Sequence, residues 1–311
     1  MLISICIPAY KNIVFLEQLL HSISIQEFRD FEVIVSDDSP DQDAEKLCDV
    51  YINSFRIIYH RNNPALGTPE NWNEAIRRAN GDWIKIMHDD DWLSSKDSLS
   101  LFARSVLENP NASFFFSAYI NIRPEGLQQT VRINPFRKRK LFDNAVTLFS
   151  RNVIGPPSVT MVRNRKDLFY DKRMKWMVDV DYYIRYLAHS KPVYIDQPLI
   201  NVGIHQEQVT NYTFRIQEVE IPENFLLLEK VGTKHLKDLL IYDAWWRIVR
   251  NLKITSMQTV RDNGYHGTVP PIIEKMINWQ SGIPPFLLRM GIFSKLIMFV
   301  HYMTYRNTIH P

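Results

Sequence analysis

The chain has 311 residues, of which 45% are hydrophobic, and a formal net charge of +3 from 37 basic and 34 acidic side chains. This length accommodates one large α/β domain with an appendage or two modest domains, and the near balance of charge argues against a dedicated nucleic-acid binder. Cys6 and Cys48 show no CxxC or metal-ligand spacing, which is typical of a reducing compartment. The N-terminal apolar run breaks at Pro8 without a basic leader, so we expect no signal peptide and a cytoplasmic location.

Four apolar runs separated by helical segments predict a parallel sheet in residues 2–92. The runs are Leu2–Ile7, Phe31–Ser36, Phe55–His60 and Trp83–Met87. Continuous β-branched runs are typical of strands that are buried on both faces of a sheet. Helical spacing recurs from Leu16 to Ile23, the polar segment 41–53 favours a helix, and Thr68 followed by Pro69 predicts the N-cap and first position of a third helix. This alternation predicts a right-handed βαβ sheet with helices on both faces.

Polar residues follow three of these strands, at the sheet edge where open α/β folds bind ligands. They are Pro8–Asn12, Asp37–Ser39 and His88–Asp91. Three consecutive carboxylates at 89–91 repel one another, so a divalent metal such as Mg²⁺ or Mn²⁺ is one interpretation. The other is an acidic surface turn in which Asp91 caps the next helix. The absence of GxGxxG and GxxxxGK[ST] argues against a dinucleotide-binding dehydrogenase and a P-loop enzyme.

The second half of the chain is less regular. We expect a helix at 96–108, a strand at 113–120, and further strands at 158–162, 193–195 and 199–202. The basic cluster 132–140 predicts either a solvated loop or a contact for phosphate or lipid headgroups. The helix expected at 176–187 carries Asp179, Asp181 and Arg185, and the last two are four residues apart, so they can pair.

From Thr213 onward the sequence favours helices, which separates an α/β domain at 1–212 from a helical region at 213–311. The last segment, residues 284–306, is interrupted by Arg289, Gly291 and Lys295, so it is a poor candidate for a membrane span. Its mixture of apolar, aromatic and cationic residues predicts either a helix lying in a membrane interface or one packed on the protein body or on a partner.

Taken in order, the motifs resemble the family 2 glycosyltransferases, which use nucleotide sugars and have the type A glycosyltransferase fold. The motifs are SICIPAYKN at 4–12, VIVSDDS at 33–39, RNNPALGTPENWNEAI at 61–76, GDWIKIMHDDDWL at 81–93, VDVDYYIRY at 178–186 and GIHQEQVT at 203–210. The resemblance covers residues 2–205. It implies an α/β fold with a mostly parallel, Rossmann-like sheet flanked by helices, followed by a helical C-terminal extension.

The resemblance also implies roles for single residues. It implies nucleotide contacts for Pro8, Ala9, Tyr10, Asp37, Asp38, Arg61, Asn63, Gly67, Asp89 and Asp90. It implies contacts with a Mn²⁺ or Mg²⁺ ion for Asp90, Asp91 and His205. Asp179 matches the catalytic base of the family.

Two positions depart from the family pattern. His88 stands where the family usually has Asp, which leaves open which of residues 89–91 binds the metal. Val178 stands where a Glu usually precedes the base, which leaves Asp181 as a competitor of Asp179.

These residues predict an inverting transferase that moves one sugar from a nucleoside-diphosphate sugar to an acceptor hydroxyl, with Asp179 as general base. The interfacial C-terminal helix and the basic residues 137–140 suggest a lipid-linked glycan acceptor in O-antigen or capsule synthesis, at the cytoplasmic face of the inner membrane. No QxxRW motif is present, so we expect addition of a single sugar. The alternatives are a sugar nucleotidyltransferase and an inactive relative that binds only nucleotide, membrane or a partner.

Overall fold

A computed structural model of the protein describes residues 2–205 and 214–309. The chain divides into two compact units. Unit 1 comprises residues 1–142, 153–172 and 181–208, and unit 2 comprises residues 143–152, 173–180 and 209–311.

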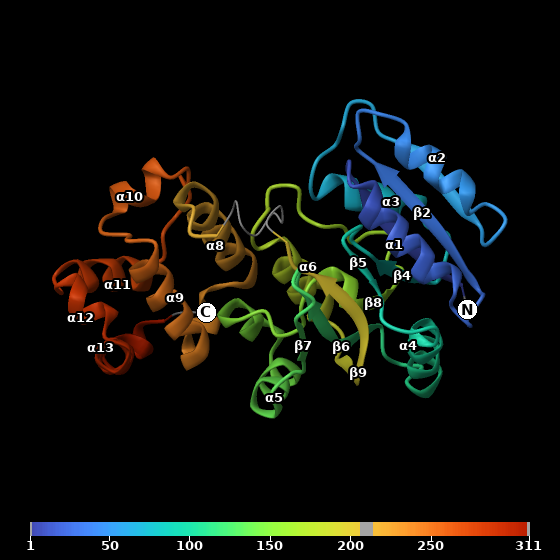
Figure 1. Cartoon of the computed structure of the whole chain (residues 1–311). Helices are drawn as coiled ribbons and strands as arrows, with labels where there is room; N and C mark the ends of the chain where they lie inside the picture. Colours follow the sequence, from blue (N-terminus) through green and yellow to red (C-terminus); the bar gives the residue numbers. More distant parts are fainter. Residues whose placement is uncertain (1, 206–213, 310–311) are drawn as a thin grey trace. The chain divides into compact units, whose positions relative to one another are not determined.

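Unit 1 is built on a mixed nine-stranded sheet, whose strand order is β3-β2-β1-β4-β8-β6-β9-β5 with β7 paired to β6 (Figure 1). The strands are β1 (Ile3–Ala9), β2 (Phe31–Asp37), β3 (Ile57–Arg61), β4 (Trp83–Ile86), β5 (Asp91–Leu93), β6 (Phe114–Ile122), β7 (Gln128–Val131), β8 (Thr160–Arg163) and β9 (Pro192–Gly203). The first four strands are parallel, as the sequence predicted. The sheet becomes mixed beyond them because β8 runs antiparallel to both β4 and β6.

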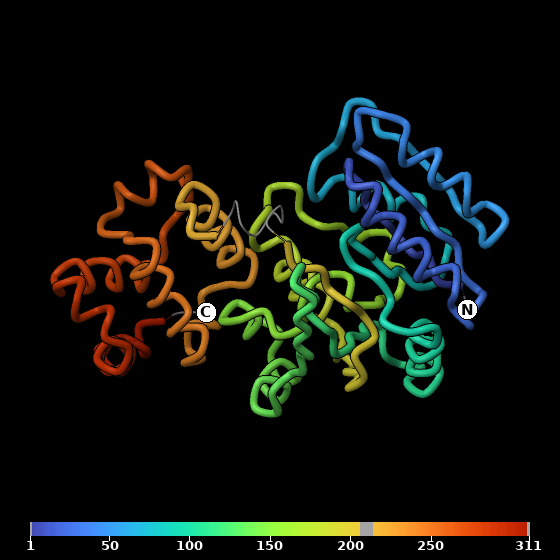
Figure 2. The backbone as a smooth tube through the Cα atoms, in the orientation of Figure 1, coloured from blue at the N-terminus to red at the C-terminus, as the bar shows by residue number. Residues whose placement is uncertain are grey.

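Helices alternate with these strands in the first part of unit 1, as the blue section of Figure 2 shows. They are α1 (Ile13–Ser24), α2 (Asp43–Val50), α3 (Glu70–Arg78) and α4 (Ser98–Glu108), followed by α5 (Pro135–Asp143) and α6 (Val178–Leu187). Residues 178–180 of α6 belong to unit 2. In α1, the predicted apolar face from Leu16 to Ile23 is buried. α1 contacts α2 and β5, whereas α3 packs on β1 and β2.

Two local expectations about helices were wrong. The N-cap of α3 is Pro69 and not Thr68, because the Gly67 carbonyl, rather than the Thr68 side chain, accepts the amide hydrogen of Asn71 (2.9 Å). The basic cluster 132–140 is not a loop, since most of it forms α5. The Asn134 side chain accepts hydrogen bonds from the first amides of this helix and so caps it.

Two expectations about strands also require correction. Asp91 does not cap a helix, because it begins β5, where it pairs with Val202 of β9. The two short strands expected at 193–195 and 199–202 are one strand, β9, whose register against β6 shifts near Ala118. This continuous strand brings its end at Gly203 next to the acidic turn that precedes β5.

Unit 2 is helical, as expected for the C-terminal region. Its helices are α8 (Gln217–Val231), α9 (Leu239–Asn251), α10 (Met257–Asp262), α11 (Pro271–Ser281), α12 (Pro285–Arg289) and α13 (Gly291–Tyr305). Large aromatic side chains form its core, with the Phe225 ring centroid 4.9 Å from that of Trp245 and 4.6 Å from that of Tyr265. Among the described residues, none of the helices combines the length and the apolar character that crossing a bilayer requires.

Candidate active site

The carboxyl ends of three parallel strands meet at one edge of the unit 1 sheet, because β1 lies between β2 and β4. The amide of Tyr10 donates to Asp89 Oδ2 (3.2 Å), which joins the end of β1 to the acidic turn. The amide of Lys11 donates to Ser39 Oγ (2.7 Å), which joins it to the end of β2. The structure therefore brings together the three polar segments that the sequence predicted to converge.

Asp38 organises the loop that follows β3. Its carboxylate accepts hydrogen bonds from the Asn62 side chain (2.9 Å) and from the amides of Leu66 (3.0 Å) and Gly67 (2.7 Å). Gly67 has a φ of 71°, a backbone conformation that glycine adopts without strain. Asp38 thus shapes the rim of the predicted nucleotide pocket, while its own contact with a base or ribose stays a prediction.

Asp37 is fully buried, and both of its oxygens have protein partners. Oδ1 accepts from the amide of Ser39 (2.9 Å) and Oδ2 from the Tyr59 hydroxyl (2.8 Å), whose pKa is raised by burial and by this bond. Arg61 donates to the Pro40 carbonyl, so its guanidinium lies over the loop after β2. Asp37 and Arg61 stabilise the strand ends on which a nucleotide contact would be built.

Sequence reasoning missed two buried asparagines behind this edge. Asn62 Nδ2 also donates to Asn71 Oδ1 (3.1 Å), and Asn71 Nδ2 donates to the Ala9 carbonyl (3.2 Å). The available signal was the four asparagines of the motif RNNPALGTPENWNEAI, because a buried side-chain amide can link segments that are distant in sequence.

The remaining predicted nucleotide contacts differ in exposure. Tyr10, Asn63 and Gly67 are exposed, whereas Pro8 and Ala9 are buried at the end of β1. The Tyr10 ring is 54% exposed and lies 4.8 Å from Lys11 Nζ. An exposed aromatic ring at a ligand-binding edge can stack on a base, so Tyr10 is the member of this set that is best placed for such a contact.

The acidic turn places three potential metal ligands together. One donor atom each from His88, Asp90 and Asp91 lie within 4.8 Å of one another. His88 Nε2 is buried and has no hydrogen-bond partner, and the His88 ring packs against Trp72 with 4.6 Å between centroids. A buried nitrogen without a protein partner is costly, so His88 Nε2 is available to accept a ligand.

The electrostatics of the turn favour a cation. Burial, together with the charge of Asp90, raises the pKa of Asp89 to about 7 and raises the pKa of Asp91 well above its usual range. Burial lowers the pKa of His88, which keeps its imidazole in the neutral form that binds metals. A divalent ion at this turn would offset the repulsion between the carboxylates.

A buried lysine, Lys85, is linked to the turn through Ser158. Lys85 on β4 donates to the Ser158 carbonyl, and its Nζ lies 5.1 Å from the Phe102 ring centroid. The Ser158 hydroxyl in turn accepts from the amide of His88 (2.9 Å). Burial lowers the pKa of Lys85 to about 7, although the charge of Asp91 opposes this shift. Lys85 and Ser158 therefore hold the end of β4 in place. Lys85 supplies only part of a positive charge to offset the carboxylates of the turn.

The end of β9 completes the cluster. His205 Nε2 lies 2.8 Å from Asp90 Oδ2, and the amide of Gly203 donates to Asp91 Oδ1 (3.2 Å). A Cβ at Gly203 would lie 2.4 Å from the Asp90 carbonyl oxygen, so this approach requires glycine. His205 thus reaches the cluster through Asp90, while His88, which the sequence identified as a departure, joins the potential ligands. The metal contact of His205 stays a prediction.

The donor set fits a divalent ion. Two carboxylates suit Mg²⁺ and Mn²⁺, whereas an imidazole nitrogen is a ligand of transition ions. The combination of His88 with Asp90 and Asp91 therefore fits Mn²⁺ better than Mg²⁺.

The two acidic residues of α6 have different environments. Asp181 is fully buried and pairs with Arg185 (2.7 Å), which confirms the predicted interaction. Asp179 Oδ2 accepts from Asn152 Nδ2 (2.8 Å), a neutral donor, and burial raises the pKa of Asp179 to about 6. A carboxylate with a pKa near neutrality can take up a proton at neutral pH, which suits a general base, and the role of Asp179 as that base stays a prediction.

Sequence reasoning also missed the residue that holds the start of α6. Glu223 on α8 accepts hydrogen bonds from the consecutive amides of Lys175 (2.7 Å), Trp176 (2.8 Å) and Met177 (2.8 Å). These amides precede the first turn of the helix that carries Asp179. A carboxylate at this position satisfies N–H groups that the helix itself cannot and complements the helix dipole.

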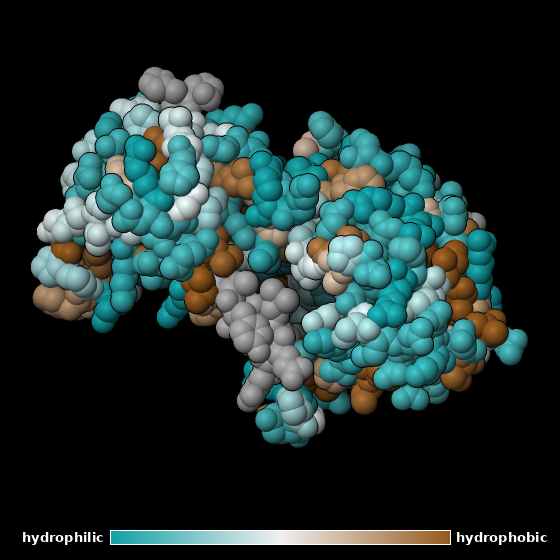
Figure 3. Space-filling model, turned by 90° about the horizontal axis from the view of Figure 1, so that it is seen from above, coloured by the Kyte–Doolittle hydropathy of each residue, from teal (hydrophilic) through white to brown (hydrophobic). Residues whose placement is uncertain are grey.

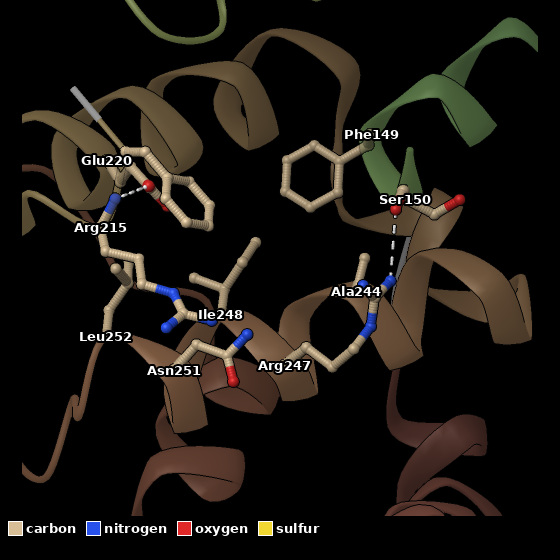
Figure 4. A pocket seen from close by; sticks show the side chains of 10 residues that line it. Phe149, Ser150, Arg215, Glu220, Ala244, Arg247, Ile248, Asn251 and Leu252 are labelled. Atoms are coloured by element: carbon tan, nitrogen blue, oxygen red, sulfur yellow. Dashed lines mark hydrogen bonds between the residues drawn. The ribbon is translucent and has the colours of Figure 1, made fainter. Parts of the chain in front are cut away.

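Unit 2 contains a separate small pocket (Figure 4). Its lining combines the aromatic ring of Phe149 with the polar side chains of Arg215, Glu220, Arg247 and Asn251. Arg247 already donates to Asp243 (3.0 Å) and to the Ser150 carbonyl (3.2 Å). Because each arginine lies near a carboxylate, the pocket has no marked charge that would select an ionic ligand.

The sequence matches known proteins over most of unit 1. The family profile described as "Glycosyl transferase family 2" matches residues 4–174. Abequosyltransferase RfbV of Salmonella typhimurium is 37% identical over 158 residues, which are 49% of this chain and 45% of that protein. A GalNAc(5)-diNAcBac-PP-undecaprenol beta-1,3-glucosyltransferase of Campylobacter jejuni is 34% identical over 95 residues, which are 30% of this chain and 31% of that protein. Each of these matches spans less than half of the relative.

Solved structures share the fold over nearly the whole chain. S. aureus TarS 1–349 in complex with UDP-GlcNAc has a TM-score of 0.57 at 16% identity, covering 91% of this chain and 92% of that one. The mannosyltransferase PcManGT from Pyrobaculum calidifontis, in complex with GDP-Man and Mn²⁺, has a TM-score of 0.57 at 13% identity. The match covers 98% of this chain and 87% of that one. At these identities the likeness concerns the fold alone.

Proposed function

The chain belongs to the family 2 glycosyltransferases, and from this premise we propose that it moves one sugar from a nucleoside-diphosphate sugar to the hydroxyl of a glycan, with inversion at the anomeric carbon. The observation that carries the proposal is the cluster of His88, Asp90 and Asp91 at the edge where β1, β2 and β4 end. Ligands of open α/β sheets bind at this edge, and two carboxylates beside an imidazole whose Nε2 has no hydrogen-bond partner suit the ion that accompanies a diphosphate.

Asp179 is the proposed general base. Its carboxylate would take the proton of the acceptor hydroxyl while the acceptor oxygen forms a bond to the anomeric carbon and the bond from that carbon to the diphosphate oxygen breaks. A pKa of about 6 leaves Asp179 mostly ionised at neutral pH yet basic enough to accept a proton. Attack opposite the leaving diphosphate inverts the anomeric configuration.

His88, Asp90 and Asp91 are the proposed metal ligands, with His205 supporting Asp90 (2.8 Å). A bound Mn²⁺ ion would supply positive charge next to the leaving diphosphate. The exposed ring of Tyr10 would stack on the nucleobase, and the loop 62–67, which Asp38 holds, would form the other wall of the nucleotide pocket.

The proposed acceptor is a lipid-linked glycan used in surface-polysaccharide synthesis. One similar protein supports this class, since its name gives an undecaprenol-linked glycan as the acceptor of a glucosyltransferase. Such acceptors carry their sugars at a membrane surface, and we propose the cytoplasmic face of the inner membrane as the place of the reaction.

A donor screen tests this function. The full chain is incubated with UDP-, GDP-, CMP- and dTDP-sugars with and without Mn²⁺, and the melting temperature and the release of free nucleotide are measured. We expect one donor class to raise the melting temperature in the presence of Mn²⁺, because ligands that bind only the native state stabilise it. The same donor should release nucleoside diphosphate.

Two outcomes would contradict the proposal. A sugar nucleotidyltransferase would instead consume a nucleoside triphosphate with a sugar phosphate and release pyrophosphate. A relative that only binds would show the thermal shift, but neither hydrolysis of the donor nor transfer to any glycan.

A further inference from the structure

The last long helix of unit 2 has an inverted distribution of polar and apolar residues. Large apolar side chains on α13 face solvent with exposed fractions from 45% to 81%, namely Ile292, Leu296, Phe299, Val300 and Met303. Their spacing of three or four residues places them in one stripe along the helix. Phe286 (65% exposed) and Met290 (55%) precede the stripe, so the apolar surface extends toward α12.

Polar contacts fix the opposite side of α13 inside the unit. Ser294 Oγ accepts from Trp246 Nε1 (3.1 Å) and from an Arg250 guanidinium nitrogen (3.1 Å). His301 Nδ1 lies 2.6 Å from the Tyr242 hydroxyl, and His301 is fully buried. Turning the helix to bury its apolar stripe would break these hydrogen bonds, so the outward stripe is part of the folded state and not a loosely packed end.

Exposed apolar residues on the rest of the surface are distributed differently. The face in Figure 3 is mostly hydrophilic, with brown apolar groups gathered in several places, some of them adjoining along the right edge. Single exposed apolar side chains, such as Leu107 on α4 (74% exposed), are normal in globular proteins. A continuous exposed apolar stripe is unusual in a globular protein. It indicates a surface that a membrane or another protein covers.

The charge of the segment indicates what covers the stripe. Residues 282–311 contain no Asp or Glu, whereas the whole chain has 34 acidic residues for 37 basic ones. The cations Arg289, Lys295 and Arg306 are exposed, and Lys295 lies within α13 itself. An apolar stripe flanked only by positive charge matches the surface of an anionic bilayer. A second copy of the chain fits less well, since two such surfaces would bring like charges together.

We propose that the outward face of α12 and α13 is a docking surface for an anionic phospholipid bilayer. The helices lie on the surface with the stripe among the acyl chains and the cations at the headgroups. The inference stands on α12, α13 and the helices that hold them, and it does not depend on the proposed sugar-transfer chemistry.

Sedimentation with phospholipid vesicles tests the surface. The full chain is mixed with vesicles of phosphatidylcholine alone or with about a third phosphatidylglycerol, and the bound fraction is measured at low and high salt. We expect at least tenfold tighter binding to the anionic vesicles, weakened by salt because the headgroup attraction is screened. The double variant Leu296→Asp with Val300→Asp should lose this binding. Leu107→Asp, at a leucine on α4 that is more exposed than Leu296, should bind like the wild type.

A charge variant separates the electrostatic contribution to vesicle binding from the apolar one. Replacing Lys295 and Arg306 with Gln should remove the preference for anionic lipid while a weak, salt-independent binding remains. Both positions are exposed, so circular dichroism and melting curves should match the wild type. Transfer to a water-soluble acceptor should also be unchanged, which keeps this test separate from the proposed function.

Three results would overturn the proposal. In the first, the wild type fails to sediment with either vesicle. In the second, the Leu296→Asp and Val300→Asp variant sediments as well as the wild type. In the third, the wild type forms a dimer in sedimentation equilibrium that this variant loses, without any vesicle binding, which would make the stripe a contact between two copies of the chain.

Discussion

The turn His88–Asp91 and the start of α6 both carry closely spaced carboxylates, but their surroundings balance the charge in different ways. In the turn, burial raises the pKa of Asp89 and Asp91, and burial lowers the pKa of the nearby Lys85 to about 7, so Lys85 carries only part of a positive charge at neutral pH. In α6, Asp181 has an arginine partner, whereas the partners of Asp179 are neutral, namely the Asn152 side chain and the amide of Val180. The comparison suggests that the turn is built to receive a cation and that α6 is built to keep one carboxylate basic.

The largest effect is expected from Asp91→Asn. We expect transfer to fall about ten-thousandfold, because a lost contact to the metal removes several kcal/mol of transition-state stabilisation. The melting temperature of the metal-free protein should change little, since the raised pKa of Asp91 already favours its neutral form. The measurements are the rate of nucleoside diphosphate release and the thermal shift on adding Mn²⁺.

Asp82→Asn is the matched control, because Asp82 is an exposed carboxylate just before the opposite end of β4. This control should behave like the wild type. The Asp91→Asn variant would contradict the proposal if Mn²⁺ still raised its melting temperature and its transfer rate stayed within tenfold of the wild type. The turn would then not need the charge of Asp91.

The second largest effect is expected from the two carboxylates of α6, one of which should affect transfer and the other stability. Asp179→Asn should reduce transfer about a thousandfold, within the range of a lost general base, without lowering the melting temperature. Asp181→Asn should instead lower the free energy of unfolding by about 2 kcal/mol, because it leaves Arg185 without its buried partner. Steady-state kinetics and urea unfolding of both variants measure the difference, and the reverse pattern would assign the base to Asp181.

A smaller effect is expected at Glu223. Glu223→Ala should lower the free energy of unfolding by about 2 kcal/mol, because three amides before α6 lose their acceptor. Transfer should fall about tenfold as Asp179 loses its fixed position. Glu223→Gln, which keeps one acceptor oxygen, should lose less of both, and Glu218→Ala, at an exposed position on the same helix, should lose neither. Equal losses in the Gln and Ala variants would argue against positioning through these amides.

The smallest effect concerns pH. Because burial raises the pKa of Asp179 to about 6, kcat/KM should fall tenfold per pH unit below that value as the base becomes protonated. The Asn152 amide stabilises the ionised carboxylate, so Asn152→Ala should raise this pKa and move the acidic limb upward by a fraction of a unit. If the acidic limb of the kcat/KM profile stays at the same pH in Asn152→Ala, a group other than Asp179 controls the pH dependence.

Much of the fold could be predicted because its signals are local. The runs Leu2–Ile7 and Phe31–Ser36 mark buried strands by their continuous apolar character, and the alternation of strands and helices fixes a parallel sheet whose strand ends share an edge. That rule alone placed Asp38 and the acidic turn near each other. Asp179 came from a different source, the resemblance of its motif to one family.

Only the tertiary structure decided which of these residues work together. The partners of the acidic turn come from far along the chain, such as His205 beside Asp90 and Ser158 below His88, and β5 exists only because Asp91 pairs with β9. Glu223 and Asn152, which hold α6 and Asp179, likewise lie outside every motif. Sequence periodicity reports the environment of neighbouring residues, whereas hydrogen bonds across long loops depend on how strands and helices pack, so these contacts could not be read from the sequence.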